Sequence, residues 1–212
     1  GETYRGNRHN AGRLLAEALP FFPALDWKKK YRGLYAALEG GRLRSYAGTG
    51  PETKEDPGVP AEKVHLLLPE TYMNLSGDSV FAAAAFFKIK PEQILVVHDE
   101  LELSLGQVSL KFSGGLGGHN GLRSMKARFG TADFWRLRIG IGRPNHDDIS
   151  GWVLSDFSPP ERVILEPVLE AAAAVLSHAL VFGPQSLLPE WNKKNIDGTV
   201  LKPIGFGKTS DL

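Results

Sequence analysis

The sequence predicts an α/β protein, a single domain of three layers (α/β/α) with a mixed, mostly parallel central sheet. Short apolar runs typical of strands alternate with helical patterns through most of the chain, which favours helices packed on both faces of one sheet. The length of 212 residues suits one domain with a substantial core. We assign residues 1–185 to this domain and residues 186–212 to a polar C-terminal tail rich in Gly and Pro.

The first part of the chain is predicted to form a helix and a hairpin. Apolar residues recur every three or four positions over 10–19, and Pro20 ends the pattern. Residues 33–38 and 42–46 are strand-like, and the Glu39-Gly40-Gly41 segment between them is typical of a hairpin turn. Gly, Pro and acidic residues at 48–62 indicate a solvated loop.

The rest of the domain is predicted from the same two periodicities. Short apolar runs indicate strands, and longer segments with an apolar face indicate helices. The predicted strands are 64–68, 94–97, 107–112 and 135–141, and the predicted helices are 75–88, a segment with Leu122, Met125 and Phe129 on one face, and 160–182.

The composition is that of a globular protein and excludes several classes. Hydrophobic residues make up 42% and charged residues 23% of the chain. The absence of cysteine excludes disulfides and thiolate metal sites. No uninterrupted apolar run approaches the roughly 20 residues of a membrane helix, so we expect no membrane partner. A net charge of +1 means that any nucleic acid would be held by a local basic patch.

The most informative segment is the glycine loop, residues 114–122, with the sequence GGLGGHNGL. Glycine permits unusual backbone angles and close approach of the main chain to another molecule. A loop of this kind that runs into a helix start presents free N–H groups to an anion. The alternative is a tight turn between a strand and a helix. The loop lacks the Gly-Lys-Ser/Thr of a P-loop, and no acidic residue ends a strand about 20 residues later as in a dinucleotide fingerprint.

Two residues are candidates for acid–base catalysis. His9 precedes the first helix, and histidine titrates near neutral pH. Asp99 follows an apolar strand, where a carboxylate can orient and stabilise such a histidine. The alternatives are a histidine that caps its own helix and an aspartate in a turn. Because no serine or cysteine is conspicuously placed as a nucleophile, an activated water is the more natural attacking group.

Neutral and basic side chains near these positions are candidates for binding. Asn10, Asn74 and Asn120 offer both donors and acceptors, suited to a water, a carbonyl or a developing oxyanion, although each also fits a helix cap. Lys111 and Arg138 lie on strands that flank the glycine loop and together could grip a phosphate, although each could be an ordinary exposed charge. The histidines His65, His98, His146 and His178 lack metal-like spacing, and we interpret them as structural or surface residues.

Five segments in order resemble bacterial-type peptidyl-tRNA hydrolases. They are RHNAG at 8–12, preceded by Tyr4, then PETYMNLSG at 69–77, HDELEL at 98–103, GGLGGHNGL at 114–122 and RLRIGIGRP at 136–144. The similarity runs over roughly residues 1–185. The family usually has a threonine where Asn7 stands and a basic residue where Ser109 stands.

The resemblance implies hydrolysis of the ester that joins a peptide to the 3′ ribose of tRNA, which recycles tRNA in translation. It implies that His9 activates water and that Asp99 holds its imidazole. Asn10, Asn74 and Asn120 would position peptide, water and ester. The remaining implied contacts are Met73, His119 and Tyr4 along the peptide channel, and Lys111 and Arg138 at the 5′ phosphate of the tRNA.

The resemblance also sets expectations for the surroundings of the site. It implies no metal and no cofactor, and we expect a cytoplasmic monomer. The family begins with a buried strand and an Asn-Pro-Gly turn, of which only the final glycine, Gly1, is in this sequence. One alternative is a catalytically inactive homologue that binds RNA or a protein partner. A second is a small-ester hydrolase on the same scaffold.

Overall fold

The computed structural model describes residues 6–43, 46 and 63–187. Tyr4, the predicted loop at 48–62 and the predicted tail beyond residue 187 therefore lie outside the described residues. Residues Pro184–Leu187, which span the predicted boundary between domain and tail, form a 3₁₀ helix whose Leu187 is buried in the core.

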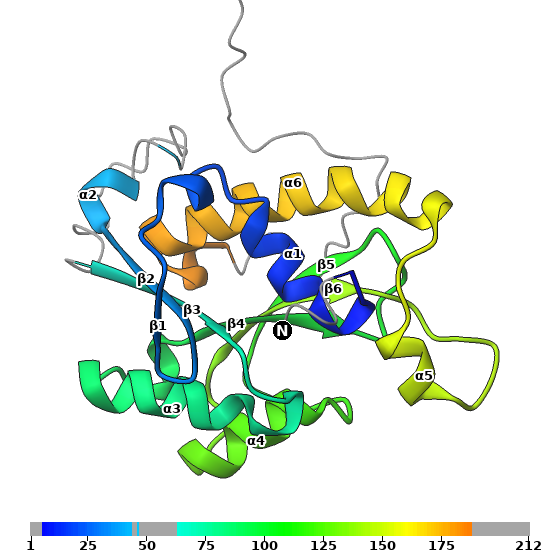
Figure 1. The fold of residues 1–212 in the computed structure, drawn as a ribbon, viewed down its shortest axis with the longest axis horizontal. Coiled ribbons are helices and arrows are strands. Elements are labelled where there is room, and N and C mark those ends of the chain that lie inside the picture. The colour runs from blue at the N-terminus through cyan, green and yellow to red at the C-terminus, as the bar shows by residue number, and fades with distance from the viewer. Residues whose placement is uncertain (1–5, 44–45, 47–62, 188–212) are drawn as a thin grey trace, which may run out of the picture.

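Helices and strands alternate along the described chain, as the sequence predicts (Figure 1). The strands are β1 (Lys28–Lys30), β2 (Gly33–Glu39), β3 (Lys63–Pro69), β4 (Leu95–Glu100), β5 (Val108–Phe112) and β6 (Trp135–Gly140). The α-helices are α1 (Ala11–Glu17), α2 (Gly40–Leu43), α3 (Ser76–Phe87), α4 (Asn120–Phe129), α5 (Ile149–Leu154) and α6 (Pro159–Phe182). Short 3₁₀ helices at Arg8–Asn10 and Met73–Leu75 precede α1 and α3 directly.

The α/β class and the mixed strand directions are confirmed. In the described residues the strands form two three-stranded sheets, in the orders β1-β2-β3 and β4-β6-β5. Only β4 and β6 pair in parallel; the other pairs in this part of the chain are antiparallel. Parallel strands need a long crossover connection. The chain between β4 and β6, which includes α4, provides such a connection for this pair. Parallel pairing is therefore less prevalent than predicted.

The predicted hairpin of residues 33–38 and 42–46 is wrong in the choice of the segments that pair. Residues Gly40–Leu43 form the short helix α2, and β2 instead turns back onto β1 through Tyr31 and Arg32. Both turn residues have left-handed φ angles, 53° and 57°. This conformation matches the twist of paired strands but is usually occupied by Gly, Asn or Asp. Because neither turn residue is of that type, the sequence carries no signal for this hairpin.

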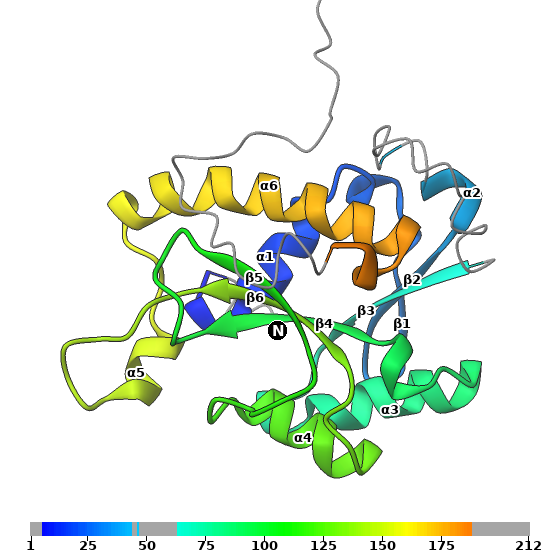
Figure 2. The same cartoon turned by 180° about the vertical axis from the view of Figure 1, so that it is seen from behind.

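Helices cover both sides of the strands (Figures 1 and 2). Helices α1 and α6 lie on one side, and α3 and α4 lie on the other. The main core lies between the strands and the α1–α6 side, and a smaller cluster around Leu122, Met125 and Phe134 lies under α4. By length and composition alone α6 could cross a membrane, a feature that the search for uninterrupted apolar runs missed. Half of the most apolar 18-residue stretch of α6 is buried inside the protein, as in a core helix.

One glycine brings the first helix very close to the sheet. A Cβ added to Gly12 on α1 would lie 2.4 Å from the main-chain oxygen of Val97 on β4. No side chain fits at that distance, so glycine is required for this contact. The contact places the residues just before α1 beside the end of β4, where Asp99 lies.

Candidate active site

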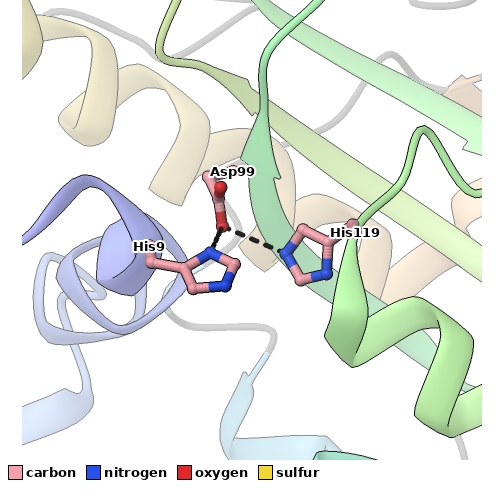
Figure 3. Close-up of side chains that lie close together, drawn as sticks. All are labelled: His9, Asp99 and His119. Atoms are coloured by element: carbon pink, nitrogen blue, oxygen red, sulfur yellow. Dashed lines mark hydrogen bonds and ion pairs between the residues drawn. The ribbon is translucent and has the colours of Figure 1, made fainter. Parts of the chain in front are cut away.

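His9 and Asp99 meet at the point where the 3₁₀ turn before α1 approaches the end of β4 (Figure 3). His9 Nδ1 lies 2.9 Å from Asp99 Oδ1. A carboxylate can only accept here, so Nδ1 carries a proton and donates it. The Nε2 of His9 is then the unprotonated nitrogen, which can accept a proton from another molecule. The sequence prediction that Asp99 orients His9 agrees with this geometry.

His119 also donates to Asp99. Its Nε2 lies 3.1 Å from the same oxygen, Oδ1. Its Nδ1 accepts from the backbone N–H groups of Gly121 and Leu122, so that His119 caps the N-terminus of α4. These two backbone donors keep the proton of His119 on Nε2. The sequence placed His119 along a peptide channel but did not predict that it shares the carboxylate with His9.

Asp99 is an ionised carboxylate in a buried position. Its residue is only 4% exposed. Burial alone would raise the pKa of Asp99, but the hydrogen bonds from His119 and His9 outweigh burial and hold the pKa well below its usual range. The site therefore has a fixed negative charge between two imidazoles, which favours a positive charge that forms on His9.

His98, the residue before Asp99, is a buried neutral histidine. Its Nδ1 donates to the main-chain oxygen of Asp99 at 2.6 Å. Burial, followed by the nearby His119, lowers the pKa of His98 to about 3. The ring packs edge-on against His119, with 5.0 Å between the ring centroids. The sequence predicts a structural or a surface role for His98, and its burial agrees with the structural role.

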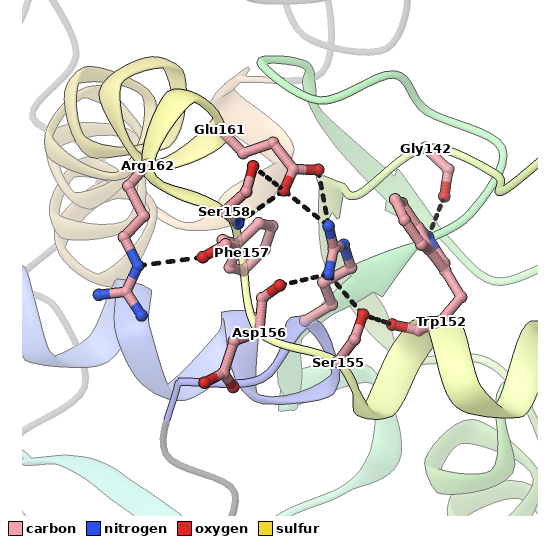
Figure 4. Close-up of polar contacts among 9 residues, drawn as sticks. Gly142, Trp152, Ser155, Asp156, Phe157, Ser158, Glu161 and Arg162 are labelled. Atoms are coloured by element: carbon pink, nitrogen blue, oxygen red, sulfur yellow. Dashed lines mark hydrogen bonds and ion pairs between the residues drawn. The ribbon is translucent and has the colours of Figure 1, made fainter.

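Arg8 anchors the segment that carries His9 through contacts to Trp152, Ser155, Asp156 and Glu161, which are labelled in Figure 4. Its guanidinium lies 3.7 Å from the ring centroid of Trp152 and contacts both carboxylate oxygens of Glu161 at 2.6 and 2.7 Å. It also donates to Ser155 Oγ and to the main-chain oxygen of Asp156, both at 2.6 Å. Both contacts to Glu161 come from Nη2, and both contacts to Ser155 and Asp156 come from Nη1. An arginine that stacks on an aromatic ring and is bonded through both terminal nitrogens fixes its backbone firmly. No sequence pattern predicts this role, because a lone arginine carries no signal of burial.

Apart from Tyr4, which lies outside the described residues, the predicted peptide-contacting residues lie on short 3₁₀ helices or at a helix start. Met73 and Asn74 lie on the 3₁₀ helix before α3. A Cβ on Gly121 would lie 2.7 Å from the sulfur of Met73 and 2.9 Å from His119, so Met73 packs beside the start of α4. Asn120 is the first residue of that helix, and Asn10 directly follows His9.

The two predicted phosphate-binding residues lie on paired strands. Lys111 on β5 pairs with Arg136, and Ser109 pairs with Arg138 on β6. Arg138 donates to Ser109 Oγ at 2.9 Å, and its Nη1 lies 3.6 Å from Glu100. Glu100 directly follows Asp99 on β4, and side chains of successive strand residues point to opposite faces, so Arg138 approaches the face of β4 opposite Asp99. The sequence analysis gave no role to Arg136, although the alternation of the strand places it on the same face as Arg138.

The histidine–aspartate group has the donor set of a possible metal site. In the described part of the chain, ligand atoms of His9, Asp99 and His119 lie within 4.8 Å of one another. The nitrogen–oxygen distances of 2.9 and 3.1 Å match hydrogen bonds. A metal ion would have to displace the protons that make these bonds.

Comparison with known proteins agrees with the resemblance. The peptidyl-tRNA hydrolase family model matches residues 1–198. The chain is 48% identical over 204 residues to the peptidyl-tRNA hydrolase of Treponema pallidum (strain Nichols), with 92% of each protein covered. It is 40% identical over 196 residues to that of Trichlorobacter lovleyi, again with 92% of each covered.

Solved structures give the same result. A crystal structure of peptidyl-tRNA hydrolase from Acinetobacter baumannii superposes with a TM-score of 0.68 at 32% identity and covers 90% of this chain and 86% of that one. A peptidyl-tRNA hydrolase in complex with N-propanol gives a TM-score of 0.71 at 32% identity, with 92% of each chain covered. The chain described here therefore belongs to the peptidyl-tRNA hydrolase family.

Proposed function

We propose that this protein hydrolyses the ester of peptidyl-tRNA and releases free tRNA and peptide. The observation that carries the proposal is the hydrogen bond from His9 to the buried Asp99, which leaves His9 Nε2 available as a base. Membership of the family supports the choice of substrate. A carboxylate that stays ionised beside His9 supports the choice of base.

In this mechanism His9 Nε2 accepts a proton from water while the water oxygen attacks the ester carbonyl carbon. The resulting imidazolium is stabilised by the charge of Asp99 through Nδ1. The bond from carbon to the 3′ oxygen of the ribose then breaks. His9 returns its proton to that oxygen, so that the products are a peptide carboxylic acid and a tRNA with a free 3′ hydroxyl.

Asparagines and Met73 are proposed to hold the peptide and the reacting ester. Asn10, Asn74 and Asn120 are uncharged and present both a donor and an acceptor, so they can bind peptide main chain of any sequence. They can also donate to the oxyanion that develops on the carbonyl. The position of Met73 against the start of α4 supports a role as one wall of this channel.

Lys111 and Arg138 are proposed to hold the 5′ phosphate of the tRNA. Both are partly buried on the β5–β6 pair, beside the strand that carries Asp99. Because His9, Asp99 and His119 all come from one chain, we further propose that the enzyme acts as a monomer. Because its proposed substrate arises in translation, we also propose that it acts in the cytoplasm.

The test is release of N-acetyl amino acid from N-acetyl-aminoacyl-tRNA, with aminoacyl-tRNA carrying a free amine as the comparison substrate. Preferential release from the blocked substrate supports the proposal. Binding of the tRNA without release would indicate an inactive RNA-binding homologue. Cleavage of small aminoacyl esters without cleavage of either tRNA substrate would indicate a small-ester hydrolase.

A further inference from the structure

Arg136 is a buried arginine whose donors are only partly used. It lies on β6 and is 2% exposed. Its Nη1 donates to the main-chain oxygen of Gly115, in the glycine loop, at 2.6 Å. Among the described residues, Nε and Nη2 of Arg136 have no hydrogen-bond partner. Buried polar groups are almost always paired, and a buried charge without a counterion is strongly disfavoured.

The unpaired side of Arg136 faces a second cation. Lys111 is its direct partner across β5 and β6, so both side chains lie on the same face. The two side chains converge on Gly114. A Cβ added there would lie 3.1 Å from Lys111 Nζ and 3.3 Å from Arg136 Nη2. Gly114, whose φ of +96° also favours glycine, places no side chain between the two cationic groups.

Arg138, the other arginine on this face, is differently engaged. It already donates to Ser109 Oγ at 2.9 Å and lies 3.6 Å from the carboxylate of Glu100. Burial, followed by the charge of Arg138, lowers the pKa of Arg136. Arg136 is thus the more deeply buried of the two guanidinium groups and the one with more unused donors.

We propose that Arg136 is a binding residue of the phosphate subsite and contacts a phosphate oxygen together with Lys111. A phosphate offers several strong acceptors to an arginine fork and to a lysine amine at once. The bond from Arg136 to Gly115 ties this subsite to the glycine loop, which contains His119 of the candidate active site. This inference rests on the proposed function, because the phosphate is taken to be the 5′ phosphate of the tRNA substrate.

The test compares two substrates on two proteins. N-acetyl-aminoacyl-tRNA is prepared with a 5′ phosphate and, after phosphatase treatment, with a 5′ hydroxyl, and kcat/KM is measured for each. For wild-type protein we expect a clear preference for the phosphorylated substrate. For Arg136→Met we expect kcat/KM for the phosphorylated substrate to fall about 10-fold or more, a loss typical of one charge-assisted contact, with little change for the hydroxyl substrate.

The outcomes separate this inference from the proposed function. Equal losses on both substrates would show that Arg136 only supports the fold, and would overturn the inference while the hydrolase activity stands. A wild-type protein that hydrolyses neither substrate overturns the proposed function and the inference with it. Arg162→Met, an exposed arginine on α6, is the matched control and should change neither value.

A second measurement avoids the risk that Arg136→Met fails to fold. The Nε–H signal of Arg136 in wild-type protein is followed by NMR during titration with acceptor-stem RNA hairpins that carry either a 5′ phosphate or a 5′ hydroxyl. We expect the signal to shift with the phosphorylated hairpin alone. The same response to both hairpins, or to neither, would contradict a phosphate contact.

Discussion

His9 and His119 donate their ring N–H groups to the same carboxylate oxygen. The acceptor is Asp99 Oδ1, at 2.9 Å from His9 and 3.1 Å from His119. The two rings lie 4.9 Å apart. His119 is held by the start of α4, and it fixes Asp99 through a second hydrogen bond beside that of His9 (Figure 3). The orientation of the proposed base thus depends on two helix starts that are 110 residues apart in the chain.

We predict that His9→Ala lowers turnover of N-acetyl-aminoacyl-tRNA by about 100- to 10,000-fold, the usual contribution of a positioned general base. The fold should persist, because the backbone of this segment is held by Arg8 rather than by His9. Turnover is measured by release of the blocked amino acid, and folding by thermal unfolding.

His146→Ala is the control for removal of a histidine. His146 is exposed and accepts a backbone hydrogen bond from Asp148 within a turn. Turnover by this variant should match wild type. Near-normal turnover by His9→Ala would exclude His9 as the base.

We predict that Asp99→Asn lowers turnover about 100-fold or more, since the amide lacks the charge that stabilises the imidazolium and can present a donor in place of the acceptor. The variant should also change the acid sensitivity of the fold. The pKa of Asp99 is held well below its ordinary value in the folded state. Asp99 therefore contributes stability above the unfolded pKa of about 3.9 that is lost as pH falls below it.

The measurement for Asp99→Asn is the free energy of unfolding at pH 5, 4 and 3 for both proteins. The difference in free energy of unfolding, wild type minus variant, should decrease toward pH 3. This holds whichever protein is the more stable at pH 5. A difference that stays constant over this range would contradict the ion pairing.

Much of this site is predictable from the sequence, because its residues lie at element ends. Asp99 follows an apolar strand, His9 precedes a helix, and the glycine loop leads into another helix, so each pattern locates a polar side chain at a predictable edge. The second hydrogen bond to Asp99 is not predictable. It depends on the angle at which α4 meets β4, which is set by packing of Leu122 and Met125 rather than by any local pattern.

The features that sequence reasoning missed share one cause. Burial of Arg8 and Arg136 is decided by distant partners, Trp152 and Glu161 for the first and the glycine loop for the second. Charged residues are rarely buried, so an arginine in a sequence is read as exposed. The β1–β2 turn was missed for a related reason, since tertiary pairing holds Tyr31 in a conformation its own type disfavours.

We predict that His98→Gln flattens the dependence of stability on pH between pH 6 and pH 4. Burial, followed by His119, lowers the pKa of His98 to about 3 in the folded protein, whereas the unfolded value is about 6.5. Between these values only the unfolded state binds the proton. The stability that His98 contributes is therefore complete above about pH 6.5 and is lost by about 1.4 kcal/mol for each pH unit below it.

Urea unfolding of wild type and His98→Gln at pH 7, 6, 5 and 4 measures this slope. Glutamine does not titrate over this range, so the comparison isolates the titration of His98. Both proteins contain Asp99, so its titration at about pH 4 cancels in the comparison. Parallel curves for the two proteins would show that His98 is not kept neutral by burial.

We predict that Gly12→Ala lowers both activity and stability although it lies outside the proposed catalytic group. The added Cβ would stand 2.4 Å from the main-chain oxygen of Val97, so α1 must move away from β4. Such overpacking of a backbone contact destabilises by about 1–3 kcal/mol. The same movement would withdraw His9 from Asp99, and misplacement of about 1 Å is enough to lower turnover about 100-fold.

Gly41→Ala provides the matched control, because the two substitutions are chemically identical. Gly41 lies in helix α2, and a Cβ there meets no described atom within 4 Å. Alanine should leave turnover unchanged and stabilise the helix by about 0.5–1 kcal/mol. If Gly12→Ala kept full turnover while it lost stability, the position of His9 would not depend on the close approach of α1 to β4. Loss of both properties, with neither lost in the control, would show that this backbone contact sets the distance between His9 and Asp99.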